Sequence, residues 1–128
     1  MFLGSLRMVK PEYTGKRDLS YNKWHRTIGD SYYMIDLDCV EWRSNKGTVA
    51  IIERALDMQK YPLEQIIEYK KFELTVASEI AEKLKVPAYL VFYNPQLTEF
   101  KIYIIQQNNA QFYKTMNDTD YADFLRKL

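Results

Sequence analysis

The chain has 128 residues with 18 Lys and Arg against 17 Asp and Glu, so its length fits one domain and its net charge of +1 excludes a uniformly basic nucleic-acid-binding protein. Apolar residues make up 47% and aromatic residues 15%, which allows a hydrophobic core and excludes a disordered chain. No apolar run approaches the roughly 20 residues that span a bilayer, no signal-peptide pattern is present, and one cysteine excludes an internal disulfide, so we expect an intracellular, cytoplasmic protein with no membrane partner.

The first part of the chain is predicted to be an irregular basic segment, residues 1–19, of a single domain that covers residues 1–128. Pro11 and Gly15 interrupt any regular element there. Residues 1–30 carry six Lys and Arg against three Asp and Glu, whereas residues 31–128 carry twelve against fourteen. A basic arm that leads into an acidic site would suit a polyanionic substrate held against a metal, although a solvated tail explains the same charges.

The rest of the chain predicts an α/β domain with a central mixed sheet of about four strands flanked by helices. Apolar alternation and short apolar runs predict the strands, and apolar steps of three and four residues predict the helices. In chain order, the expected elements are a short helix over 21–27, strands over 31–43 and 48–56 with a turn at 44–47, a long helix over 62–84, strands over 88–93 and 99–106, and a terminal helix over 119–128. The first two strands form a hairpin, and the long helix makes the second and third strands parallel.

Acidic residues on the predicted hairpin form the first candidate site. Asp36 and Asp38 share one face of the first strand, and Glu53 follows the buried run Val-Ala-Ile-Ile on the second. A carboxylate in so apolar a stretch is costly unless it is paired, hydrogen-bonded or metal-bound. If the register sets these acids against one another, their oxygens favour a hard ion such as Mg²⁺ or Mn²⁺. The alternative is that they pair with Arg26, Arg43 or Arg54.

The order of these elements resembles the PD-(D/E)XK nuclease superfamily over about residues 20–106. The likeness rests on Asp38, the hairpin turn, the run Ile-Ile-Glu-Arg-Ala at residues 51–55, and a helix that begins near Gln65. Residues 86–91 also fit a later core strand of that family. The general likeness is to small archaeal members related to Holliday-junction resolvases. It implies a restriction-endonuclease-like fold, a DNA partner, a possible homodimer and metal-assisted hydrolysis of phosphodiesters.

The same resemblance implies roles for individual residues. Asp38 and Glu53 correspond to the two metal-ligating acids, with Asp36 as a further candidate ligand. The main-chain carbonyl of Arg54 would be another ligand, and Gln65 resembles a glutamine that many members place beside the site.

One position departs from the family pattern. The family's lysine lies two residues after the acid, on the same strand face, and that position is Ala55. Arg54 points to the opposite face. Either the cation has moved, to Lys70 or Lys71 on the helix or to Lys46 in the turn, or the chain keeps the fold without efficient cleavage and serves as a nucleic-acid-binding or protein-interaction module.

The stretch from Tyr21 to Arg26 is the second candidate feature, because family members often have a helix at the edge of the site. The resemblance implies that His25 assists proton transfer or contacts phosphate, and that Arg26 and Lys23, with Lys46 of the turn, bind the substrate. The alternative is that Trp24 packs on the core and His25 lies at the surface. One histidine and one cysteine exclude a zinc site.

Overall fold

The computed structural model describes residues 18–128, so most of the predicted irregular basic segment lies outside the described residues. The chain divides into two units, Met1–Met34 and Ile35–Leu128, and each is described by itself. In the first unit, α2 (Ser20–His25) takes the place of the helix predicted over 21–27. The ring of Tyr21 lies 5.4 Å from that of Trp24 and 6.3 Å from that of His25, so this helix carries its own small aromatic cluster.

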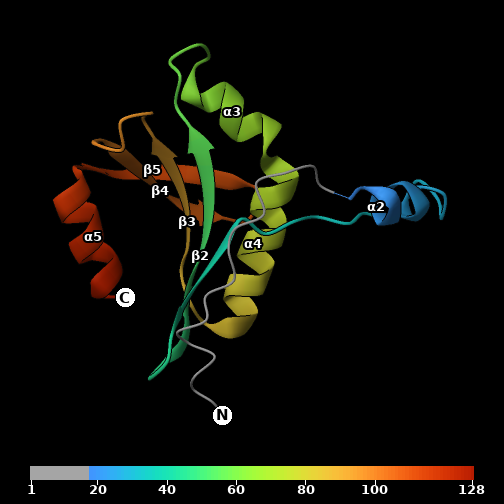
Figure 1. The fold of residues 1–128 in the computed structure, drawn as a ribbon, viewed down its shortest axis with the longest axis horizontal. Coiled ribbons are helices and arrows are strands. Elements are labelled where there is room, and N and C mark those ends of the chain that lie inside the picture. Colours follow the sequence, from blue (N-terminus) through green and yellow to red (C-terminus); the bar gives the residue numbers. More distant parts are fainter. Residues whose placement is uncertain (1–17) are drawn as a thin grey trace. The chain divides into compact units, whose positions relative to one another are not determined.

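The second unit is a five-stranded mixed sheet with helices on both faces (Figure 1). The general α/β class and the mixed sheet are therefore confirmed, but the sheet has five strands where about four were predicted. Its strands are β1 (Cys39–Arg43), β2 (Gly47–Leu56), β3 (Ala88–Tyr93), β4 (Phe100–Gln106) and β5 (Asn109–Met116), and its helices are α3 (Leu63–Tyr69), α4 (Lys71–Leu84) and α5 (Asp118–Arg126).

The strands lie side by side in chain order, from β1 at one edge to β5 at the other. β2 and β3 are parallel, as the crossover through the predicted long helix requires, and the other neighbours are antiparallel. β2 is central enough to be buried on both faces, with five consecutive buried residues from Val49 to Glu53. This explains why its sequence reads as a continuous apolar run rather than as an alternation.

The first predicted strand was too long. It was expected over residues 31–43, but β1 begins at Cys39. Two hydrogen bonds to side chains mark the end of the β1–β2 pairing. The N–H of Asp38 donates to the Glu53 carboxylate, and the N–H of Arg54 donates to the Asp38 carboxylate. Next to the last main-chain pair, Cys39 with Ile52, side-chain carboxylates thus join the two segments.

The long helix predicted over 62–84 is two helices, α3 and α4, that meet at Lys70. Lys70 has φ −93° and ψ 10°, and its N–H is shared between the carbonyls of Ile66 and Ile67, which is the tightened hydrogen bonding of a helix end. No glycine or proline marks this position, so the sequence offers no signal of the break.

The strand β5 was not predicted. It is an edge strand, most of its residues are exposed, and half of them are polar, so it lacks the apolar signal of the other strands. The hairpin turn before it is Gln107-Asn108, with Gln107 at φ 58°, where a two-residue turn usually has Asn-Gly. Neither the strand nor its turn therefore follows the common sequence pattern.

Two apolar layers lie on opposite faces of the sheet. One is covered by α3 and α4 and is built around Ile51, Leu74, Leu90 and Phe92. The other is covered by α5 and is built around Ala50, Ile52, Val91 and Ile102. Among the described residues, no helix has the length and apolar character needed to cross a membrane.

Candidate functional site

The structure brings Asp38 and Glu53 together at the open end of the β1–β2 hairpin. The pairing of Cys39 with Ile52 continues in register to place Asp38 opposite Glu53. The main-chain N–H of Asp38 donates to Oε2 of Glu53 at 2.9 Å, and the main-chain N–H of Arg54 donates to Oδ2 of Asp38 at 2.9 Å. Each carboxylate is thus held by the backbone of the other strand, and both orientations are set by the register.

Glu53 is the single charged residue among the buried described residues and is 1% exposed. Burial raises the pKa of its carboxyl above the usual range, while the hydrogen bond from the Asp38 N–H and the charge of Lys70 lower it. The negative charges of Asp38 and Glu73 raise the pKa further. Glu53 is therefore an acid held in an apolar layer, where a nearby cation would stabilise its ionised form.

Lys70 supplies a positive charge that acts on Glu53. It is half-buried at the junction of α3 and α4, and its ammonium lowers the pKa of Glu53. It lies on the same helical stripe as Leu74 and Ala77, both buried against the sheet, which directs it toward β2. Among the lysines considered to replace the family's strand lysine, Lys70 is the one whose charge acts on Glu53.

Glu73 is a residue that sequence reasoning missed. It is half-buried in the first turn of α4, and its charge acts on Glu53. The signal was its position three residues after Lys70, which puts both side chains on one helix face. Lys70 and Glu73 thus add one positive and one negative group to the surroundings of Glu53.

The other two candidate lysines lie elsewhere. Lys71 is exposed and forms an ion pair with Glu68 at 3.2 Å. Lys46 lies in the turn at the opposite end of the hairpin, seven residues along β2 from Glu53, which corresponds to roughly 23 Å of strand. That distance exceeds the reach of a lysine side chain, so Lys46 can contact only a long substrate that extends along the hairpin.

Ala55 and Arg54 lie as strand alternation predicts. Ala55 packs against the layer under α3 and α4, on the face of Glu53. Arg54 faces the α5 side together with Cys39 and Tyr121. No ion pair within residues 18–128 joins Asp38 or Glu53 to an arginine, and Arg43 pairs instead with Glu41 at 2.9 Å.

The remaining predicted residues lie at other places in the described part of the chain. Asp36 is exposed ahead of β1, and Gln65 is exposed on α3, where it lines a hollow of about 390 Å³ with Tyr61, Ile66 and Tyr69. Lys23, His25 and Arg26 belong to the first unit, where Lys23 and Arg26 are exposed and His25 stacks on Tyr21. Their roles stay predictions.

The oxygen atoms of Asp38 and Glu53 fit a hard divalent ion in chemical type. Mg²⁺ is commonly held by one or two carboxylates, with water and substrate phosphate completing its shell. Among residues 18–128, no group of three or more His, Cys, Asp or Glu side chains is arranged to hold a metal ion. The described residues therefore offer a two-carboxylate site, and Asp36 is not part of a three-acid cluster with them.

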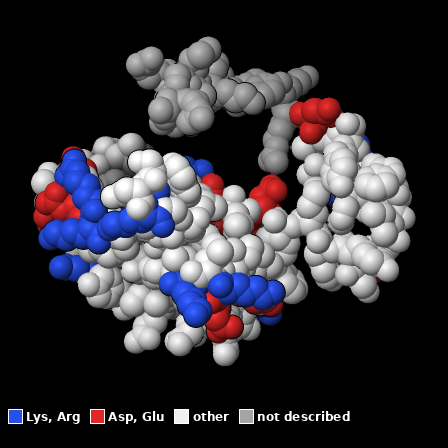
Figure 2. All heavy atoms as spheres, turned by 90° about the horizontal axis from the view of Figure 1, so that it is seen from below, with Lys and Arg blue, Asp and Glu red and all other residues white. Residues whose placement is uncertain are grey.

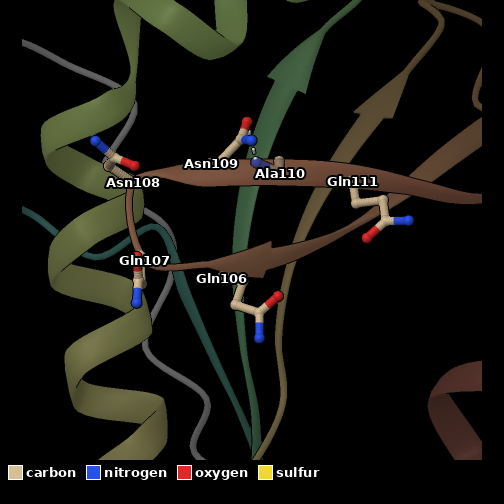
Figure 3. A pocket seen from close by; sticks show the side chains of 6 residues that line it. All are labelled: Gln106, Gln107, Asn108, Asn109, Ala110 and Gln111. Carbon is tan, nitrogen blue, oxygen red and sulfur yellow. Dashed lines mark hydrogen bonds between the residues drawn. The ribbon is translucent and has the colours of Figure 1, made fainter.

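Surface charge is mixed on the face shown in Figure 2, where basic side chains lie next to acidic ones and form no large patch of one sign. A second polar feature is the β4–β5 turn, whose hollow of about 410 Å³ is lined by Ala110 and five amide side chains (Figure 3). These amides point in different directions, and Asn109 Oδ1 is bonded to the N–H of Ala110. This turn contains no acid, base or nucleophile.

Comparison with known proteins adds no assignment. No known protein family, curated protein or solved structure matches this chain.

Proposed function

We propose that this chain is a nuclease-like protein that binds DNA and hydrolyses phosphodiester bonds with Mg²⁺ or Mn²⁺. The observation that carries the proposal is that main-chain N–H groups hold the carboxylates of Asp38 and Glu53 beside the charge of Lys70. The resemblance of the hairpin and its following helix to the PD-(D/E)XK pattern supports the same activity. A buried acid whose pKa is shifted by burial and by nearby charges, as at Glu53, is typical of functional sites.

In this proposal, Asp38 and Glu53 bind the ion, and their main-chain hydrogen bonds hold the two carboxylates in place. The ion that these two carboxylates would hold would supply Lewis-acid activation of the phosphate and of a water molecule. Lys70 takes the role of the family's strand lysine, because its ammonium stabilises negative charge at the phosphate beside Glu53. Gln65 and His25 remain candidates for contacts with water or phosphate at the edge of the site.

The direct test is cleavage of labelled duplex, single-stranded and branched DNA with Mg²⁺ or Mn²⁺. Glu53→Gln should abolish cleavage, since it removes the ligand charge while it keeps an acceptor for the Asp38 N–H. Glu79→Gln is the matched control, because Glu79 is an exposed acid on α4. No cleavage by the unmodified protein, or equal cleavage by the Glu53 variant, contradicts the proposal.

Lys70 has a matched control one residue away. Lys70→Met should lower cleavage by about 10²-fold or more, in the range of a lost transition-state contact, whereas Lys71→Met should leave it unchanged, since Lys71 pairs with Glu68 at the surface. Equal loss in the two variants would mean that the effect is general electrostatic attraction of DNA rather than a contact at the site.

A second function is favoured by Ala55. Without the strand lysine, the chain would act as a nuclease-fold protein that binds nucleic acid or another protein without cleavage. This alternative predicts salt-dependent DNA binding with no hydrolysis in any divalent ion. The Ala55→Lys variant tests this alternative. A gain in cleavage by this variant would indicate that the site lacks only the strand lysine.

The proposal also includes DNA contacts by Lys23, Arg26 and Lys46, and a homodimer as in small members of the superfamily. If one of these cations contacts a phosphate directly, its substitution by Gln should reduce the slope of log affinity against log salt concentration by about one. Sedimentation equilibrium measures the oligomeric state, and a monomer at all concentrations contradicts the dimer.

A further inference from the structure

A hollow of about 390 Å³ lies on the α5 side of the sheet, on the opposite face from Asp38 and Glu53. Its size falls within the range of small-molecule sites, which bind most of their ligand's surface in a mainly apolar setting. Its wall combines apolar and polar side chains from several strands and α5, among them Cys39, Ile52, Arg54, Phe100, Tyr121 and Leu125.

Flat aromatic groups form part of this wall. The rings of Phe100 and Tyr121 are stacked, with centroids 4.5 Å apart and planes at 21°. Phe100 and Tyr121 also pack against the buried layer that contains Ile52 and Val91, and this packing holds them in place. A planar aromatic ligand in the hollow would pack against these rings. Aromatic groups prefer such contacts to be offset-stacked or edge-to-face.

Arg54 gives the hollow a positive charge. Its side chain lines the hollow together with Cys39 and Tyr121. Glu41, the acid in the wall, is already paired with Arg43 at 2.9 Å. No ion pair joins Arg54 to an acid in the part of the chain that the structure describes.

Tyr121 adds a hydroxyl that stays protonated at neutral pH. Burial raises the pKa of Tyr121 to about 12, with the charge of Glu41 acting in the same direction. The hydroxyl is therefore available as a hydrogen-bond donor. An arginine fork and a neutral hydroxyl beside stacked rings are suited to a carboxylate attached to an aromatic body.

We propose that this hollow is a binding site for a small aromatic carboxylate, with Arg54 on the carboxylate and Phe100 and Tyr121 against the ring. The site is independent of the proposed nuclease function, because it lies across the sheet from Asp38 and Glu53. Arg54 contacts Asp38 only through its main-chain N–H, so substitution of its side chain keeps that hydrogen bond.

The probe is 2-naphthoate, with the uncharged 2-naphthamide as its matched analogue, titrated into the full chain labelled with ¹⁵N. Naphthoate should shift the amide signals of residues in the hollow, and naphthamide should bind at least about tenfold more weakly because it lacks the charge-assisted bond to Arg54. Arg54→Gln should weaken naphthoate by a similar factor, and Glu53→Gln should leave its affinity unchanged. The amide spectrum also shows whether each variant is folded.

Cys39 offers a second readout that does not depend on Arg54. It is the one cysteine of the chain and it lines the hollow, so its alkylation by uncharged iodoacetamide should slow as naphthoate saturates the site. The proposal is overturned if naphthoate does not bind up to its solubility limit, if acid and amide bind equally, if Arg54→Gln binds as tightly as the unmodified protein, or if Cys39 is not protected.

Discussion

Replacement of Glu53 by Gln should change how the stability of the protein depends on pH. Glu53 is 1% exposed and accepts a hydrogen bond from the Asp38 N–H, and burial raises its pKa in the folded state. In the unfolded chain its pKa returns to about 4.3. Each pKa unit of difference between the folded and unfolded states corresponds to about 1.4 kcal/mol in the free energy of unfolding.

The sign follows from proton binding. Below the unfolded-state pKa both states hold the proton, and the neutral carboxyl contributes its full stability. As the pH rises toward the raised folded-state pKa, the unfolded chain loses its proton first, so the free energy of unfolding falls. Glu53→Gln has no such titration. Its stability relative to the unmodified protein should therefore rise with pH, between about pH 4 and the folded-state pKa.

The assay is urea unfolding followed by tryptophan fluorescence in EDTA, at several pH values from about 4 to about 8. Glu79→Gln serves as an exposed control and should follow the unmodified protein. Glu53→Ala should be less stable than Glu53→Gln by about 1–3 kcal/mol, because the Asp38 N–H loses its acceptor. A difference between Glu53→Gln and the unmodified protein that is constant with pH would refute the reasoning.

Three further predictions concern stability and ion binding. Leu74→Ala should destabilise the protein by about 2–5 kcal/mol in urea unfolding, because Leu74 is fully buried in the layer under α4. Asn117→Ala should cost about 1 kcal/mol, since the Asn117 side chain accepts from the Asp120 N–H at 2.8 Å and caps α5, and Asn117→Asp should cost little. At neutral pH, Mg²⁺ should raise the melting temperature of the unmodified protein but not of Glu53→Gln, and an equal rise in both would exclude an ion at Glu53.

Much of the second unit was predictable because its periodic signals are local. The β1–β2 turn, the burial of β2, the strand β3 and the parallel crossover follow from apolar runs, turn residues and the length of the connection. The opposite faces of Glu53 and Arg54 followed from strand alternation alone. Strand β5 gave no such signal, because an exposed edge strand needs no apolar pattern to pair its backbone.

The sequence by itself determined that an acid would follow the most apolar run of the chain. It predicted Asp38 on the neighbouring strand, whereas Asp38 directly precedes β1. Only the tertiary structure decided that the Glu53 carboxylate accepts the Asp38 N–H and the Asp38 carboxylate accepts the Arg54 N–H. It also decided that Glu53 is buried, and that the charges of Lys70 and Glu73 act on it. The physical reason is register and packing. The alignment of two strands and the docking of α4 on β2 depend on contacts between residues far apart in the chain, which local patterns do not encode.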